Sequence, residues 1–328
     1  MKAREVRAAS GRATRTPKDG ATASARRGAL AALLCTVFAP HAALAAGTQP
    51  RARVSGFGVD AAGCGSIAAP CRTLQYAHDD VVAPGGSIYV KDPANYGQIV
   101  IRQAISIIND GSGTATILAP SGDAIDVQVG ASDSVLIKGL TLDGAGTGTI
   151  GVAMYSGGDL VIEDCTIQSF HRGSGVVIAP PNGATPTFLI DRARVVGSDK
   201  GDGVAVVPPG AATGQIRATT FANNAVGVYV QSGAVVIEDS VIEGLSTSYS
   251  YGLVSTGAGT AVVAKRSHFN GLGTGALSQG GASLGLSDDA FTHNHLDLYN
   301  PQSAATLNSY GDNAYSSSGG TITQATKQ

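Results

Sequence analysis

The chain has 328 residues, of which 45 are Gly and none is Trp, and only 14% of it is charged. Such a Gly content, together with many Val, Ile and Thr residues, indicates short strands separated by turns. Eight of the 22 Lys and Arg residues and two of the 24 Asp and Glu residues lie in residues 1–45, which leaves 14 cationic against 22 anionic residues. This negative excess argues against nucleic acid or an anionic membrane surface as the main partner.

Residues 1–45 are predicted to be a secretory signal peptide. A basic stretch is followed by the apolar run GALAALLCTVFAP (28–40) and by small residues that end at Ala43-Leu44-Ala45. The apolar run is shorter than the ~20 residues that span a bilayer. We therefore expect a periplasmic or secreted protein that does not span the membrane once the signal is removed.

Residues 46–86 are predicted to form an N-terminal loop and a capping helix. Cys64 and Cys71 are expected to form a disulfide in an oxidising compartment, and no second Cys pair or nearby His favours a metal site instead. In CRTLQYAHDDVVAPGG (71–86), Leu74, Ala77 and Val81 have helical spacing. Such a helix would cover the open end of a repeat structure.

Residues 87–315 contain a repeated phrase. LVIEDCTIQS (160–169) returns as VVIEDSVIEG (235–244), and related segments recur every 21 to 28 residues from 135 to 312. In each, an aliphatic residue is followed five positions later by another apolar one, as in Ile137/Leu142, Ile162/Ile167, Ile190/Val195, Ile216/Phe221 and Ile237/Ile242. A Gly with a short apolar run lies between the copies. Short strands at this period predict a parallel β-helix of nine or ten coils, with a C-terminal tail at 316–328.

The same residues resemble a known family. The Pro-Cys-Arg-Thr start, the helix, the entry strand SIYV and coils of the type V-x-I-x-D-C/S-x-I are similar to secreted bacterial proteins of the pectate-lyase-like superfamily, over about residues 53–315. This resemblance implies an all-β, single-stranded, right-handed parallel β-helix. It does not select an activity, since the superfamily includes pectate lyases, polygalacturonases, alginate lyases, tailspikes and adhesins.

The catalytic signatures of the superfamily are missing, apart from an echo of a paired Asp motif in Ser287-Asp288-Asp289. The first expectation is therefore an exported, non-catalytic module that presents an elongated surface to a polysaccharide or a surface protein. The alternative is a polysaccharide lyase or hydrolase that acts on an acidic polysaccharide in a lateral groove. Whether the protein is an enzyme stays open, as does its oligomeric state. No cofactor is expected, except that a lyase would bring Ca²⁺ into consideration.

The best candidate site lies in the turns before the Gly-containing strands. His171 and Arg172 are expected one coil from Asp199, Lys200 and Asp202, within about 5 Å of backbone spacing. Two adjacent loops, APPNGATP (179–186) and VPPGAATG (207–214), would wall a groove beside them. The candidate catalytic residues are Arg172, Asp199, Lys200 and Asp202, and the candidate binding residues are His171, Arg172, Asn223 and Asn224. The alternative reading is a set of surface ion pairs between loops.

Other polar positions favour structural roles. Lys138, Glu163, Asp191, Arg217, Glu238 and Lys265 form an outward column that suggests cross-strand ion pairing. Cys165 heads a column of small residues, in which Asp289 is the odd member and is expected to be strained or to face outward. His293 and His295 would need a third ligand to bind a metal. Ala153, Val177, Ala205, Tyr229, Val254 and Leu277 are expected to form an apolar outer column.

Overall fold

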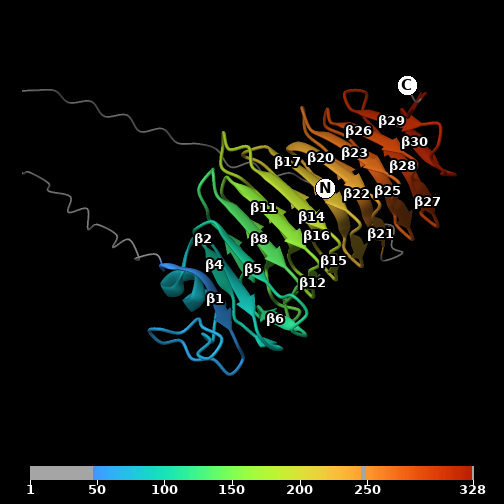
Figure 1. Cartoon of the computed structure of the whole chain (residues 1–328). Helices are drawn as coiled ribbons and strands as arrows, with labels where there is room; N and C mark the ends of the chain where they lie inside the picture. The colour runs from blue at the N-terminus through green and yellow to red at the C-terminus, as the bar shows by residue number, and fades with distance from the viewer. Residues whose placement is uncertain (1–46, 245–248, 327–328) are drawn as a thin grey trace, which may run out of the picture. The chain divides into compact units, whose positions relative to one another are not determined.

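The computed structural model describes residues 47–244 and 249–326. The predicted signal peptide, 1–45, lies outside the described residues. Three long parallel sheets, called here sheets A, B and C, run through the described chain, and successive coils add one strand to each (Figure 1). No helix in this part of the chain has the length and apolar character needed to cross a bilayer.

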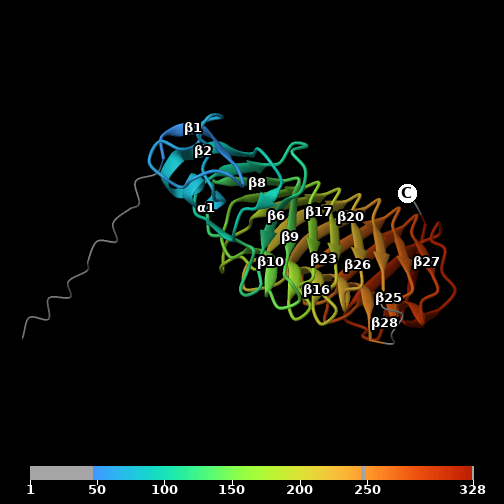
Figure 2. The same ribbon diagram turned by 90° about the horizontal axis from the view of Figure 1, so that it is seen from below.

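The strands of each sheet stack in coil order, as the view from below shows (Figure 2). Sheet A contains β1 (Gln49–Val54), β2 (Val82–Val90), β5 (Ile105–Ile108), β8 (Ser134–Lys138), β11 (Asp159–Glu163), β14 (Thr187–Asp191), β17 (Ala212–Arg217), β20 (Gly233–Glu238), β23 (Ala261–Lys265), β26 (Ser283–Ser287), β29 (Thr306–Tyr310) and β31 (Thr323–Ala325). Sheet B contains β3 (Ala94–Asn95), β6 (Ala115–Leu118), β9 (Leu140–Asp143), β12 (Thr166–Gln168), β15 (Arg194–Val196), β18 (Thr220–Ala222), β21 (Val241–Glu243), β24 (His268–Asn270) and β27 (Ala290–Thr292). Sheet C contains β4 (Ile99–Ile101), β7 (Ile125–Val127), β10 (Ile150–Met154), β13 (Ser174–Ile178), β16 (Asp202–Val206), β19 (Val226–Val230), β22 (Tyr251–Ser255), β25 (Thr274–Ser278), β28 (Leu296–Asn300) and β30 (Ser318–Gly320).

The predicted parallel β-helix is confirmed, with small differences at its ends. Among the described residues, nine successive sets, from β2-β3-β4 to β26-β27-β28, place one strand in each sheet. This is the lower end of the nine or ten coils expected. Sheet pairing also extends beyond the expected limits of 87–315, since β1 pairs with β2, and β30 and β31 pair with β28 and β29.

The core consists of the apolar columns that the repeat predicts. In sheet A, Ile137, Ile162 and Ile190 align in register on neighbouring strands, and the column continues through Ile216 and Ile237. All five side chains are buried. Strands about 4.8 Å apart bring each isoleucine into contact with the next, so one coil covers the apolar surface of its neighbour.

The corner between sheets A and B is held by a hydrogen-bonded column of small residues. Thr219 N–H donates to Ser240 Oγ at 3.2 Å, and Ser240 N–H donates to Ser267 Oγ at 3.3 Å. Ser267 N–H donates to Asp289 Oδ1 at 2.8 Å. Asp289 was expected to be strained or to face outward, but it is buried, and its own N–H continues the column by donating to Asn313 Oδ1 at 2.8 Å.

Cys165 belongs to the same column and is packed rather than reactive. Its thiol is buried and lies 3.3 Å from the carbonyl oxygen of Glu163. Burial raises the pKa of the thiol to about 12, so it stays protonated at neutral pH. The expected structural role of Cys165 is confirmed.

The N-terminal segment is stapled and only briefly helical. The expected disulfide between Cys64 and Cys71 is present, with 5.0 Å between the Cα atoms. The helical segment consists of one α-helical turn, α1 (Leu74–Tyr76), and a π-helical stretch, η1 (Ala77–Val81), after which β2 begins. Leu74, Ala77 and Val81 are buried, as their spacing predicts. The role of this segment as a cap stays a prediction.

A column of inward-facing glycines brings sheet C close to sheet B. It contains Gly151, Gly175, Gly203, Gly227, Gly252 and Gly275. A Cβ added at Gly275 would lie 2.6 Å from Phe291 Cδ1 and 2.6 Å from the carbonyl oxygen of Asp297. A Cβ added at Gly285, on β26, would have its nearest neighbour at 3.8 Å. The glycines of this column are therefore required by packing.

We predict that Gly275→Ala lowers the free energy of unfolding by about 1–3 kcal/mol, because the methyl group overpacks the core. Gly285→Ala should leave stability unchanged or raise it by up to about 1 kcal/mol, because the alanine restricts the unfolded chain. Urea unfolding followed by circular dichroism gives the midpoint of each variant. Equal midpoints for the two variants would contradict the packing argument.

Candidate functional site

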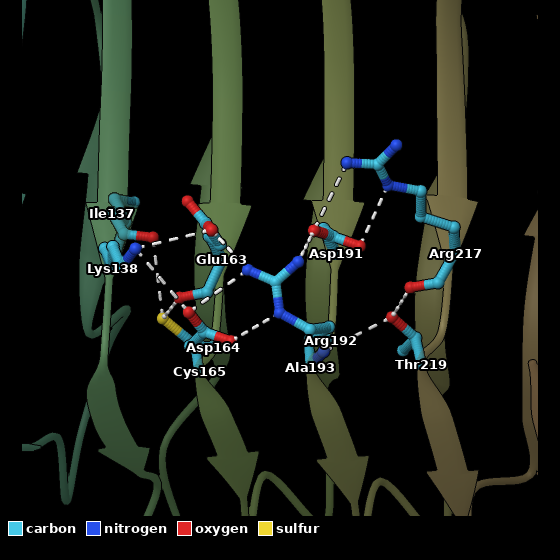
Figure 3. A network of polar contacts seen from close by, with 10 residues as sticks. All are labelled: Ile137, Lys138, Glu163, Asp164, Cys165, Asp191, Arg192, Ala193, Arg217 and Thr219. Atoms are coloured by element: carbon cyan, nitrogen blue, oxygen red, sulfur yellow. Dashed lines mark hydrogen bonds and ion pairs between the residues drawn. The ribbon is translucent and has the colours of Figure 1, made fainter.

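The charged column on the outer surface of sheet A is an ion-pair network (Figure 3). Lys138 Nζ lies 3.4 Å from Glu163 Oε1, and Arg217 Nε lies 2.9 Å from Asp191 Oδ1. Arg192 lies between these pairs and contacts both Glu163 and Asp191. The like-charged neighbours Glu163 and Asp191 are thus bridged by one guanidinium. Cross-strand ion pairing, the structural reading of this column, is confirmed.

The corner residues beside this network have an unusual backbone conformation. Asp164, Arg192, Asp239, Arg266 and Asp288 all have φ between 50° and 56°. Asp and Asn adopt this left-handed conformation more readily than most residues, but Ala218 at the equivalent corner also has φ 49°, so the turn itself and not the side-chain charge sets it. The two arginines form ion pairs from this position, and Arg266 Nε lies 2.7 Å from Asp239 Oδ1 on the neighbouring coil. We infer that this charged surface stabilises the fold and is not a functional site.

The THNH segment is not assembled as a metal site in the described part of the chain. His293 adopts φ 56° and its Nδ1 lies 3.1 Å from Asn270 Oδ1, while His295 is exposed. Asp297 is buried and accepts backbone N–H groups from Ser316 and Ser317. The nearby carboxylates therefore have structural partners of their own.

Calcium has no suitable ligand set near the candidate turns. Ca²⁺ takes six to eight oxygen ligands. Within residues 47–244 and 249–326, the one cluster of three or more ligating side chains is Asp60, Cys64 and Cys71. The two cysteines form the disulfide, and Asp60 accepts the N–H groups of Arg72 and Thr73.

The turns before β13 and β16 bring the predicted residues onto adjacent coils. Lys200 N–H donates to the carbonyl oxygen of His171 at 3.1 Å, and His171 Nδ1 lies 2.8 Å from Asp199 Oδ1. Arg172 and Lys200 are both exposed. Within the described chain their side chains form no ion pair. Two free cations therefore lie beside a His–Asp pair, as the coil alignment predicts.

The other two predicted binding residues have different environments. Asn223 is exposed and adopts φ 56°. Asn224 is buried, accepts Ser198 N–H at 3.0 Å and donates to the carbonyl oxygen of Val195 at 3.0 Å. Asn224 thus holds the corner between sheets B and C, and only Asn223 is available to a ligand.

Asp202 is the first residue of β16 and differs from the other carboxylates of these turns. Its side chain is half-buried, and together with burial its charge raises the pKa of Tyr229, which lies on the outer face of sheet C. No hydrogen bond or ion pair holds its carboxylate within the described residues, although its N–H donates to Ser174 Oγ at 3.3 Å. Burial raises the pKa of Asp202 to about 6. A half-buried carboxylate with such a pKa suits proton transfer near neutral pH.

Tyr229 lies on the neighbouring strand and shares this environment. It aligns with Ala205 of β16, three residues after Asp202. Burial, and then the charge of Asp202, raise the pKa of Tyr229, so its hydroxyl group stays protonated. Sequence reasoning placed Tyr229 in an apolar column and missed this pairing, because proximity to Asp202 depends on the register of sheet C.

The predicted apolar column itself is confirmed as a column, but most of it is buried. Ala153, Val177, Ala205, Tyr229, Val254 and Leu277 align in register on the outer face of sheet C. Ala153 is 0% exposed and Leu277 is 6% exposed. The same column continues one coil earlier with Asp126, which aligns with Ala153. With Asp123 and Tyr155, it forms a second polar region on the same face.

The two inserted loops lie at the opposite ends of β13 and β16 from the turn residues. Gly210 N–H donates to the carbonyl oxygen of Pro180 at 2.8 Å, and Thr213 N–H donates to that of Pro186 at 3.0 Å. The two loops are thus hydrogen-bonded to one another along the side of sheet C.

We refer to Arg172, Lys200, Asp202 and Tyr229 as the Asp202 site.

Residues 123–324, more than half of the chain, match the family described as "Right handed beta helix region". The chain therefore belongs to this family of right-handed parallel β-helix proteins. No curated protein sequence matches it.

Among solved structures, the pectate lyase Pel9A is similar, with 15% identity, a TM-score of 0.60 and coverage of 84% of this chain and 78% of that chain. An alginate lyase from Paenibacillus sp. str. FPU-7 has 14% identity, a TM-score of 0.44 and coverage of 74% and 92%. At this identity, the similarity to the pectate lyase shows a shared fold. The pectate-lyase-like architecture expected from the sequence is thus confirmed, and the disulfide is compatible with a protein outside the cytoplasm.

Because its pKa is about 6 in the folded chain, against about 3.9 in an unfolded chain, Asp202 should reduce stability as it ionises. Its contribution to stability is fully present below pH ~3.9 and is lost as the pH rises through about 6. We predict that Asp202→Asn is more stable than the original chain by about 1–3 kcal/mol at pH 7–8, and that the difference disappears near pH 4.

Urea midpoints measured from pH 4 to 8 check this prediction. Asp199→Asn is the matched control, because the Asp199 carboxylate already pairs with His171 and should give no gain at high pH. If the stability difference between Asp202→Asn and the original chain does not change with pH, the claim that burial raises the pKa of Asp202 is contradicted.

Proposed function

We propose that the protein is an exported polysaccharide lyase that cleaves a uronate-containing polysaccharide at the Asp202 site. The site would lie in the periplasm or outside the cell, where such polymers occur. The polysaccharide is the proposed partner, and no nucleic acid or membrane contact is involved. The single observation that carries the proposal is the Asp202 carboxylate, which has a pKa of about 6 and no partner among the described residues, next to the turns that carry the exposed cations Arg172 and Lys200.

The chemistry of the proposed reaction is a β-elimination. A base removes the proton from C5 of the uronate, next to its carboxylate, and the electron pair forms a double bond between C4 and C5. The bond from C4 to the glycosidic oxygen breaks, and that oxygen takes up a proton. The reaction therefore needs a base, a positive charge beside the uronate carboxylate and a proton donor.

The residues of the Asp202 site supply each of these groups. Asp202 is assigned as the base, since at pH 7 it is largely ionised and has no partner among the described residues that would lower its basicity. Arg172 and Lys200 are assigned to the uronate carboxylate, whose charge increases as the proton leaves. Tyr229 is assigned as the proton donor to the leaving oxygen. The His171–Asp199 pair, at 2.8 Å, would hold the turn that carries the two cations.

The non-catalytic surface expected first, for a polysaccharide or protein partner, has no comparable observation in its favour. The apolar outer column that would form such a surface is mostly buried. A hydrolase is also less favoured, because hydrolysis commonly uses two carboxylates across the glycosidic bond. Asp199, the nearest candidate for a second carboxylate, instead pairs with His171.

The proposal predicts that the chain lacking residues 1–45 releases unsaturated, ultraviolet-absorbing products from polygalacturonate, alginate or a uronate-containing heteropolysaccharide. Asp202→Asn should lower kcat/KM by a factor of about 10²–10⁴, as expected for the loss of a general base. Arg172→Ala and Lys200→Ala should raise KM and also lower kcat, because both cations face a carboxylate whose charge increases in the transition state.

Arg194→Ala is the matched control for Arg172→Ala, since Arg194 is an exposed arginine on β15 of sheet B. It should leave the kinetics unchanged. Binding of the polymers without any unsaturated product or new reducing ends would support the non-catalytic alternative. Reducing ends without unsaturation would indicate a hydrolase.

A further inference from the structure

A pocket of about 300 Å³ opens on sheet C at its first two strands, outside the Asp202 site. It is lined by Gln75, Gln98, Ile99, Val100, Asp123 and Asp126. Val100 of β4 and Asp126 of β7 align in register and form its floor. Gln75 comes from α1, Gln98 directly precedes β4, and Asp123 lies two residues before β7 begins. The pocket therefore combines a helical turn, a sheet surface and two carboxylates.

One carboxylate oxygen in the pocket has no partner. Asp126 Oδ2 accepts a hydrogen bond from Gln128 Nε2 at 2.7 Å. Asp126 Oδ1 is buried and accepts none. An unsatisfied buried oxygen costs free energy that a bound donor would recover. The pocket thus offers an acceptor that the described chain leaves unused.

The two carboxylates lie close enough to affect one another. Burial, and then the charge of Asp126, raise the pKa of Asp123, opposed by a hydrogen bond with the backbone of Ile150. No Lys, Arg or His forms an ion pair with either carboxylate among the described residues. A positively charged ligand would therefore remove a repulsion that the protein itself does not compensate.

The two glutamine side chains are already engaged and form rigid walls. Gln75 Oε1 accepts Val100 N–H at 2.8 Å, and Gln75 Nε2 donates to the carbonyl oxygen of Val100 at 3.2 Å. Gln98 Nε2 donates to the carbonyl oxygens of Ser121 and Asp123 at 2.7 and 2.8 Å. Their amide donors are not available to the carboxylates. The positive charge and the donors must come from the ligand.

Tyr155 provides an aromatic surface one coil away. It follows β10, is 43% exposed, and its N–H donates to the carbonyl oxygen of Val127 at 3.2 Å. Met154, the residue before it, aligns with Val127, so Tyr155 lies on the coil next to Asp126. Burial, and then the charges of Asp123 and Asp126, raise the pKa of Tyr155. An exposed tyrosine ring beside acceptors can contact the face of a sugar ring or a cation.

We propose that this pocket binds an amino sugar unit through its free ammonium group, with Asp123 and Asp126 as acceptors and Tyr155 against the sugar ring. The ammonium group supplies both the positive charge and the N–H donors that the pocket lacks. A uronate unit is disfavoured there, because its carboxylate would face two others.

This inference deepens the proposed function and rests on it for the identity of the polymer. Asp126, Ala153, Val177 and Ala205 align on successive strands of sheet C, so the pocket lies three coils from Asp202, or about 14 Å. Buried Ala153 and the half-buried Val177 form the floor between them. One chain could cross both places. The substrate class is then a heteropolysaccharide that contains both uronate and amino sugar units.

The test is calorimetric titration of the chain lacking residues 1–45 with a glucosamine trisaccharide. Its N-acetylated form and a galacturonate trisaccharide are the comparison ligands. The free amine should bind at least about tenfold more tightly than the acetylated sugar, since a charge-assisted hydrogen bond contributes about 1.5–3 kcal/mol. Affinity should increase as the pH rises through the raised pKa of Asp123, because that carboxylate then ionises.

Asp126→Asn should weaken binding of the glucosamine trisaccharide by about tenfold or more. The control Asp110→Asn, at an exposed turn, should not. Tyr155→Leu should also weaken binding, and its exposed position keeps the test valid if Asp126→Asn folds poorly. Equal affinity for the free and acetylated sugars would overturn the proposal. So would unchanged binding by Asp126→Asn, or Ca²⁺ binding that depends on Asp126 without any binding of the glucosamine trisaccharide.

The outcome can be separated from that of the proposed function. Asp202→Asn should still bind the glucosamine trisaccharide with unchanged affinity, because Asp202 lies three coils away. If the protein binds the glucosamine trisaccharide but has no lyase activity, the proposed amino sugar site is supported and the proposed reaction at Asp202 is contradicted. If the protein has lyase activity but does not bind the trisaccharide, only the proposed amino sugar site is contradicted.

Discussion

Backbone pairing between successive coils is the constraint on which the rest of this protein depends. Each strand hydrogen-bonds in register to the strand one coil before and one coil after it. A residue therefore has two fixed neighbours at equivalent positions, and every side chain belongs to a column. The isoleucine column, the hydroxyl column and the charged column of Figure 3 are three results of the same alignment. A one-residue change of register in any strand would exchange core and surface positions along that strand.

This alignment also explains where function can arise. Columns that repeat without interruption are occupied by residues that support their neighbours, as in the Arg192 bridge between Glu163 and Asp191. Asp202 departs from this pairing of charges in its column, because its neighbours Ser174 and Val226 are uncharged and neither neutralises its carboxylate. Asp126 likewise precedes a run of small apolar residues in its column. In a structure where nearly every polar group is paired along the axis, such interruptions are the informative positions.

Much of the fold followed from the repeated phrase alone. The spacing of Ile162 and Ile167 placed both in the core, and the alignment of their equivalents predicted the sheet register. The turn residues His171 and Lys200 were also correctly expected on adjacent coils. These successes have one cause, since a period read from the sequence converts directly into neighbours in space.

The properties that could not be predicted from the sequence depend on the surroundings of each side chain and not on the spacing of the repeat. The pKa of Asp202 depends on how much surrounding side chains exclude water, and the pocket at Asp126 depends on where α1 packs. Asp289 was expected to be strained or to face outward, yet it is buried and its carboxylate accepts the N–H groups of Ser267 and Ser287. The helix was expected to stop at Pro84-Gly85-Gly86, but β2 already begins at Val82, which pairs with Gln49 of β1.

The buried position of Asp289 has a consequence for how such a chain can be extended. Ser240 and Ser267 each accept a hydrogen bond from the preceding coil and donate one to a carbonyl oxygen of their own coil. Asp289 replaces the serine one coil later. Its carboxylate accepts the N–H groups of Ser267 and Ser287, and its own N–H donates to Asn313 Oδ1 at 2.8 Å on the next coil. The corner column therefore passes from hydroxyl groups to a carboxylate and then to an amide toward its C-terminal end. A further coil can continue the column wherever it offers a side-chain oxygen to the N–H group of the coil before it, whether that oxygen belongs to a hydroxyl, a carboxylate or an amide group.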